Sequence, residues 1–153
     1  YCLSFGKFGS FYSKSSKQKL VATSSTHAEI RALYTLTLDI IYIVHLCEEV
    51  GRPIDLPAVV FEDNQPVIDL TKTLSSKVTR SKHFLMLIEF IREQVMEGLI
   101  ELRKIPTESN VADLLTKLIV GKTFTTKAMH LLGEMGMSLN VNESYDELNF
   151  EQE

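Results

Sequence analysis

The sequence predicts an α/β domain, because short apolar strand patterns alternate with longer helical patterns along the chain. The segment 24–50 repeats apolar residues at spacings of three and four, as one face of a helix does. The segment 58–61 is continuously apolar, which is typical of a strand covered on both faces of a parallel sheet. With 153 residues, 44% of them hydrophobic and 24% charged, the chain has the size of one globular domain.

The beginning of the chain predicts a β-hairpin that leads toward the long helix. Residues 1–5 have the pattern of a strand, residues 6–9 contain two glycines suited to a turn, and residues 10–12 return as a second strand. Residues 24–26 are Ser-Ser-Thr, whose hydroxyl groups suit the N-cap of a helix.

The long helix is predicted to have one apolar face, and the acidic residue Glu29 falls on that face. The apolar positions are Leu33, Leu36, Ile40, Ile43, Cys47 and Val50. Gly51 and Pro53 are expected to end this helix near Val50.

The remaining chain predicts further helices and one more strand. Helices are expected for residues 66–70, 80–97 and 124–132 and at the segment carrying Asp113, and a strand for residues 99–105. The apolar face of the helix 80–97 is expected to comprise Phe84, Leu87, Ile88, Ile91 and Val95. We expect residues 1–133 to form one domain and the acidic residues 134–153 to be a disordered tail.

The composition excludes several classes of protein. Charged residues interrupt the apolar stretches before membrane-spanning length, and no secretory signal pattern is present, so we expect neither a membrane nor a secreted protein. Cys2 and Cys47 do not form a disulfide framework, which favours a reduced, intracellular setting. The net charge of −4 argues against a general nucleic-acid coat, although the first 28 residues contain four lysines and no acid.

Three carboxylates stand beside apolar segments. Glu29 lies on the helix face, Asp63 follows the strand 58–61, and Asp113 stands between Val-Ala and Leu-Leu. Ionised side chains are rarely buried unless they are paired or bind a metal. Each residue also has a simpler interpretation: Glu29 and Asp113 as acids near a helix start, and Asp63 as a turn former. If folding brings them together, they predict a cation site.

Three motifs, which follow one another along the chain, make the prediction of a cation site more specific. Residues 24–29 read Ser-Ser-Thr-His-Ala-Glu, residues 62–65 Glu-Asp-Asn-Gln, and residues 111–117 Val-Ala-Asp-Leu-Leu-Thr-Lys. Shorter supporting matches lie at residues 16–19, 80–83, 90–93 and 105–108. In this order and spacing, from Tyr1 to about Gly133, the chain resembles the ribonuclease H domain of copia-type retrotransposon polyproteins.

The resemblance implies an RNase H-like fold, in which helices flank a mixed sheet, and a nuclease that cuts the RNA strand of an RNA–DNA hybrid. It also implies two Mg²⁺ or Mn²⁺ ions, held by Glu29, Asp63 and Asp113 as catalytic residues. Hard cations prefer oxygen ligands, and two metal ions can activate water and stabilise the leaving oxygen. The implied partners are the hybrid and the reverse transcriptase and integrase parts of the parent polyprotein. The implied location is a cytoplasmic virus-like particle or the nucleus.

The chain departs from the family pattern at its beginning. The family's first metal-binding Asp lies on a central strand that precedes the segment starting at Tyr1, and this chain has no Asp or Glu before Glu29. We therefore expect an N-terminally truncated domain that lacks the central strand and is catalytically inactive or nearly so. Smaller departures are His27 for the usual Glu, residues 84–85 (Phe-Leu) for Ile-Asp, and Leu118 for Pro.

Nucleic-acid contacts and a non-catalytic role remain open alternatives. Phosphates of a hybrid could be contacted by Lys17, Lys19, Arg80, Lys82 and His83. Solvated surface residues explain these five equally well. A non-catalytic RNase H-like module that binds nucleic acid or a protein is the second functional hypothesis, and a fragment without stable function is the third.

Overall fold

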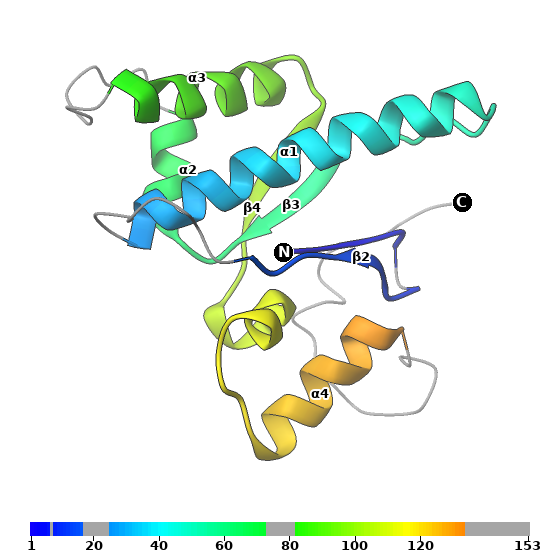
Figure 1. The fold of residues 1–153 in the computed structure, drawn as a ribbon, viewed down its shortest axis with the longest axis vertical. Coiled ribbons are helices and arrows are strands. Elements are labelled where there is room, and N and C mark those ends of the chain that lie inside the picture. The colour runs from blue at the N-terminus through cyan, green and yellow to red at the C-terminus, as the bar shows by residue number, and fades with distance from the viewer. Residues whose placement is uncertain (7, 17–24, 73–81, 134–153) are drawn as a thin grey trace. The chain divides into compact units, whose positions relative to one another are not determined.

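The computed structural model describes residues 1–6, 8–16, 25–72 and 82–133 (Figure 1). The chain divides into two compact units. Of the described residues, the first unit comprises Tyr1 and residues 15–16, 25–72 and 82–110, and the second comprises residues 2–6, 8–14 and 111–133. The tail predicted for residues 134–153 lies outside the described residues.

The first unit contains three α-helices and a parallel pair of strands. Its elements are α1 (Ser25–Glu49), β3 (Ala58–Glu62), α2 (Gln65–Lys72), α3 (Lys82–Met96), β4 (Ile100–Lys104) and the 3₁₀ helix η1 (Thr107–Ser109). Strands β3 and β4 are parallel, with Val60 opposite Leu102. Two parallel neighbours need a crossover connection, and here it contains α2 and α3. The predicted strands and helices of this region are confirmed.

The core of the first unit lies where α1, α2, α3 and the strands meet. Fully buried side chains come from α1, α2, α3 and β4: Ile30, Val67, Ile91 and Ile100. The predicted apolar face of α1 is confirmed at Leu33, Leu36 and Ile40, which are buried.

The predicted face is wrong at the C-terminal end of α1. Val50 is 64% exposed, whereas Val44, which was not predicted, is only 5% exposed. The C-terminal part of α1 extends beyond α2, α3 and both strands of its unit (Figure 1). Val44 is the last buried residue of α1, and beyond it Leu46 and Val50 are exposed, so apolar spacing does not identify a buried face there.

Helix α1 is also long and apolar enough to cross a membrane by length and composition. Asp39 interrupts the apolar stretch of this helix, as expected from the sequence, although the helix is apolar on average over that length. Core helices pass the same test, and six residues of α1 are buried within the protein. α1 is apolar on more than one face, which is why its mean hydropathy is as high as that of a membrane-spanning helix.

Arg92 connects α3 to the C-terminal end of α2 through two hydrogen bonds. Its Nε donates to the carbonyl of Thr71 at 3.2 Å, and its Nη2 donates to the carbonyl of Leu70 at 3.0 Å. The last carbonyls of a helix have no intrahelical partner, so this buried guanidinium supplies one.

The second unit contains the predicted hairpin and the last helix. Its elements are β1 (Cys2–Ser4), β2 (Ser10–Ser13), the 3₁₀ helix η2 (Val111–Leu115) and α4 (Gly121–Leu132). Strands β1 and β2 are antiparallel, which confirms the hairpin. The turn packs backbone to backbone on the end of α4: a Cβ added at Gly9 would lie 2.4 Å from the nitrogen of Gly133.

The segment carrying Asp113 was expected to begin an α-helix, and this expectation is wrong. Asn110 has an extended backbone, with φ −71° and ψ 101°, and separates η1 from η2. The N–H of Thr116 donates to the carbonyl of Asp113 at 3.0 Å, the three-residue spacing of a 3₁₀ turn. The chain therefore makes two short 3₁₀ turns here.

The α/β class is confirmed, and the mixed sheet was expected to lack its central strand. In the described part of the chain, the strands form two separate two-stranded sheets, β1–β2 and β3–β4. The RNase H-like arrangement stays a prediction. Since no third strand among the described residues pairs with β3 or β4, nothing there joins the two ladders into one sheet.

Candidate functional site

Acidic residues gather at the carboxyl end of β3 in the first unit. Glu62 is the last residue of β3, and Asp63 follows it. Glu29 comes from the N-terminal part of α1, and the side-chain amide of Asn64 donates a hydrogen bond to its carboxylate. The long helix thus places Glu29 next to the loop that carries Asp63. The carboxyl end of parallel strands is a common location for ligand sites in α/β proteins.

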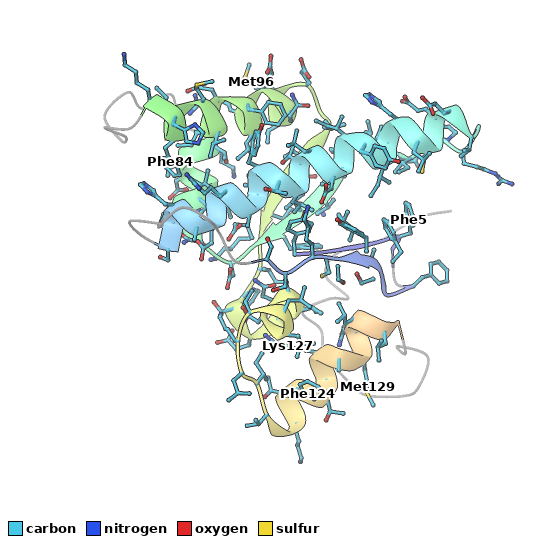
Figure 2. The ribbon with its side chains drawn as sticks, in the orientation of Figure 1. Phe5, Phe84, Met96, Phe124, Lys127 and Met129 are labelled. Atoms are coloured by element: carbon cyan, nitrogen blue, oxygen red, sulfur yellow. The ribbon has the colours of Figure 1, made fainter. Side chains whose placement is uncertain are left out.

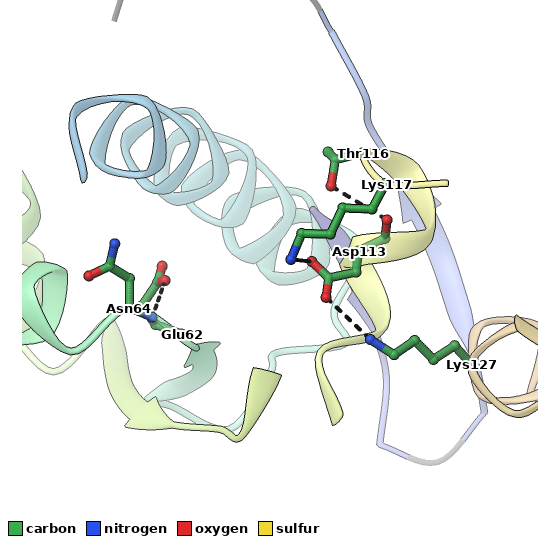
Figure 3. Close-up of polar contacts among 6 residues, drawn as sticks. All are labelled: Glu62, Asn64, Asp113, Thr116, Lys117 and Lys127. Carbon is green, nitrogen blue, oxygen red and sulfur yellow. Dashed lines mark hydrogen bonds and ion pairs between the residues drawn. The ribbon is translucent and has the colours of Figure 1, made fainter. Parts of the chain in front are cut away.

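Glu62 has a strongly perturbed carboxyl group. The pKa of Glu62 is raised to about 7, mainly by burial and in smaller part by the negative charges of Glu29 and Asp63. The backbone N–H of Asn64, which donates to Oε1 of Glu62 at 2.9 Å (Figure 3), lowers that pKa, as does the charge of Lys104. Burial and the neighbouring negative charges thus favour the protonated form of Glu62 more than water does.

Sequence reasoning missed Glu62. The available signal was its position directly before Asp63 at the end of an apolar strand, where a second carboxylate would share the environment of the first. The same reasoning missed Lys104, whose ammonium donates to the backbone carbonyl of Asp63. Lys104 follows from the parallel register, which places it opposite Glu62.

Asp113, in the second unit, is a buried carboxylate paired with two lysines. It is 7% exposed. Its Oδ1 lies 2.7 Å from Nζ of Lys117, and its Oδ2 lies 3.2 Å from Nζ of Lys127 (Figure 3). Lys127, which projects from α4 (Figure 2), is itself 5% exposed. Both carboxylate oxygens are thus engaged by ammonium groups, which accounts for the burial of Asp113 without a metal.

The structure therefore brings Glu29 and Asp63 to one end of β3, while Asp113 belongs to the other unit. Within residues 1–6, 8–16, 25–72 and 82–133, no three His, Cys, Asp or Glu side chains lie close enough to hold a metal ion. Mg²⁺ often binds through one or two carboxylates, with water and substrate phosphates as the remaining ligands. Glu29 and Asp63 fit that partial set of ligands. The convergence of all three predicted carboxylates stays a prediction.

Two of the predicted phosphate-contacting residues lie within the described structure. Lys82 and His83 are exposed in the first turn of α3. The other three, Lys17, Lys19 and Arg80, lie outside the described residues. Exposure at a helix start makes phosphate contact by Lys82 and His83 sterically feasible, and the contact itself stays a prediction.

His27 and Phe84, at two positions where the resemblance predicts other residues, pack against each other. The ring of His27, at the start of α1, lies 3.9 Å from the ring of Phe84 on α3, measured between centroids. Phe84 (Figure 2) is buried in the core between these helices. An imidazole beside a phenyl ring is compatible packing, whereas an acidic side chain at position 27 would face an apolar ring. The two replacements are therefore mutually consistent.

The chain is similar to segments of retrotransposon polyproteins. Over 105 residues it is 34% identical to the Retrovirus-related Pol polyprotein from transposon RE2 of Arabidopsis thaliana, a match that covers 67% of this chain and 7% of that protein. Over 111 residues it is 35% identical to the Retrovirus-related Pol polyprotein from transposon TNT 1-94 of Nicotiana tabacum, covering 72% and 8%. Over 120 residues it is 28% identical to the Transposon Ty1-NL2 Gag-Pol polyprotein of Saccharomyces cerevisiae, covering 76% and 7%.

The chain thus spans less than a tenth of the length of these relatives. No protein-family model matches it. No solved structure matches it.

Proposed function

Because the homologues of this chain are retrotransposon Pol polyproteins, we propose that it is the ribonuclease H segment of such a polyprotein. Within a longer protein, it takes part in hydrolysing the RNA strand of RNA–DNA hybrids. The observation that supports this proposal most is the group of acids at the carboxyl end of β3: Glu29, Glu62 and Asp63. The reverse transcriptase and integrase parts of the polyprotein are its proposed partners, in a cytoplasmic virus-like particle or the nucleus.

In this proposal Glu29 and Asp63 hold Mg²⁺ or Mn²⁺ through their carboxylate oxygens. When bound, the metal supplies an activated water and stabilises the leaving oxygen. Glu62 adds negative charge beside the ligands, and Lys104 offsets part of it. Asp113 is the third proposed ligand. It can serve only if an ammonium group of Lys117 or Lys127 gives up its contact, since both carboxylate oxygens are already engaged.

The proposal includes low activity for residues 1–153 by themselves. Two divalent ions need several carboxylates nearby, and the segment before Glu29 contributes none. A further carboxylate from outside residues 1–153 completes the site. The hybrid is held through its phosphates by Lys82 and His83, together with Lys17, Lys19 and Arg80.

A cleavage assay tests this proposal. The substrate is an RNA–DNA hybrid labelled on the RNA strand, with Mg²⁺, and the two proteins are residues 1–153 and a version extended with the upstream coding sequence. We expect the extended protein to cleave at least about 100-fold faster, and Asp63→Asn to remove about 100-fold or more of that activity. The matched control is Asp69→Asn, an exposed acid on the neighbouring helix α2.

Three outcomes would refute the assignment. These are equal cleavage by the extended protein and its Asp63→Asn variant, an equal loss in Asp69→Asn, and no cleavage by any form despite tight binding of the hybrid. The first two would exclude a specific role for Asp63, and the third would exclude catalysis.

The pairing of Asp113 with Lys117 and Lys127 favours a second candidate function, a non-catalytic RNase H-like module that binds nucleic acid or protein. A carboxylate that is neutralised by lysines needs no metal. Such a module would bind the hybrid equally well in Mg²⁺ and in a chelator, whereas the nuclease would bind it more tightly with Mg²⁺. Fluorescence anisotropy with a labelled hybrid separates the two.

A further inference from the structure

Helix α1 has a second apolar surface on the side away from its buried face. Leu38 is 41% exposed, Tyr42 is 68% exposed and Leu46 is 43% exposed. They recur every four residues and therefore lie along one side of the helix, roughly opposite Ile40 and Val44, which are buried. A helix that is apolar on opposite sides is normally covered on both. Within the described residues, only the side of α1 that contains Ile40 and Val44 is covered.

The exposed side has the spacing of a helix-pairing surface. Arg31, Thr35, Leu38, Tyr42, His45 and Glu49 follow one another at alternating spacings of four and three residues. This is the heptad spacing of residues that meet a partner helix. We name these six residues the α1 seam. Its centre is apolar, one end carries a positive charge and the other a negative charge.

The α1 seam is complementary to itself when two copies run antiparallel. A second copy centred between Leu38 and Tyr42 places Leu38 opposite Tyr42 of the other chain. The same alignment places Arg31 opposite Glu49 at both ends, because these residues are equally distant from the centre. A parallel arrangement would instead place Arg31 opposite Arg31 and Glu49 opposite Glu49, which is repulsive.

The charges at the C-terminal end of α1 give an independent reason to expect a positively charged side chain next to Glu49. The last turn contains Glu48 and Glu49 and no basic residue. The C-terminus of a helix carries partial negative charge, so acids there are unfavourable unless a positive group lies nearby. Arg31 of an antiparallel copy supplies that group at each end of the pair.

We propose that α1 forms an antiparallel homodimer through the α1 seam, with a second copy of this chain as the partner. The dimer has two apolar Leu38–Tyr42 contacts at its centre and an Arg31–Glu49 ion pair at each end. This inference rests on the first unit alone and does not depend on the proposed function.

Charge reversal tests this arrangement. Sedimentation equilibrium of residues 1–153 is expected to show a dimer. Arg31→Glu and Glu49→Arg are each expected to raise the dissociation constant about tenfold or more, since each change makes both ion pairs repulsive. The double variant, Arg31→Glu with Glu49→Arg, is expected to restore dimerisation. Glu48→Arg, an exposed neighbour outside the α1 seam, is the matched control.

Far-UV circular dichroism establishes that each variant remains folded, and Tyr42→Ser gives a second test without any change of charge. The inference is wrong if the wild-type chain stays monomeric up to millimolar concentration, or if the double variant is weaker than both single variants. It is also wrong if Glu48→Arg weakens the dimer as much as Glu49→Arg. Co-sedimentation of the folded chain with phosphatidylcholine vesicles in place of dimerisation would assign the apolar surface to lipid.

Discussion

Replacing Asp113 with asparagine is expected to lower the free energy of unfolding of the second unit by about 3 kcal/mol. The side chain of Lys127 is 7% exposed, and its Nζ lies 3.2 Å from Oδ2 of Asp113. Removing the carboxylate charge takes a counter-ion from this buried cation, which is more costly than the loss of an exposed ion pair. Amide hydrogen exchange of α4, measured without divalent metal, reports the loss.

Lys117→Met is the matched control for this prediction. The side chain of Lys117 is 54% exposed, and its ion pair with Asp113 is screened by solvent, so the expected cost is about 1 kcal/mol or less. The double variant Asp113→Leu with Lys127→Met should recover most of the stability, because it removes both buried charges. A cost for Asp113→Asn no greater than that for Lys117→Met would show that Asp113 is not a structural ion-pair residue.

Glu62 is expected to make the first unit less stable as the pH rises. Its pKa in the folded protein is raised to about 7, mainly by burial, from a value of 4.5. Between these values the folded state binds more protons than the unfolded state, so the free energy of unfolding falls with increasing pH and levels off above about 7. Because Glu62 is partly exposed, we expect about 1–2 kcal/mol from this group, after discounting for solvent screening.

Glu62→Gln is expected to remove this contribution. Thermal denaturation between pH 4.5 and 8 should show a flatter profile for the variant than for the wild-type chain. Glu93→Gln, at an exposed position on α3, should keep the wild-type profile. If wild type and Glu62→Gln lose stability in parallel over this range, the carboxyl of Glu62 is not perturbed in the way described.

Local patterns predicted most of the secondary structure. The glycine-containing turn and the apolar residues around it identified the hairpin, and the continuous run 58–61 identified β3. These features are determined by backbone preferences and side-chain periodicity within a few residues. The α-helix predicted to carry Asp113 is wrong because residues 111–115 form the short 3₁₀ helix η2, and apolar spacing over five residues does not distinguish a 3₁₀ helix from an α-helix.

The composition of the candidate site could be predicted only in part. Glu29 and Asp63 were identified through ordered motifs, and they do come to the same end of β3. Glu62 and Lys127 were missed because their significance arises from tertiary contacts. Burial gives Glu62 its raised pKa, and the packing of α4 brings Lys127 to Asp113. The position of Glu62 next to Asp63 was a signal that could have been used, whereas the contact of Lys127 with Asp113 has none in residue spacing.

The central claim is that the carboxylates at the end of β3 bind a divalent cation, and a magnesium titration of thermal stability tests it most directly. At about twenty times the dissociation constant, Mg²⁺ is expected to stabilise residues 1–153 by about 1–2 kcal/mol. Asp63→Asn should abolish this gain, while Asp69→Asn should retain it. An equal gain in both variants, or no gain in the wild-type chain at any magnesium concentration, would contradict the account.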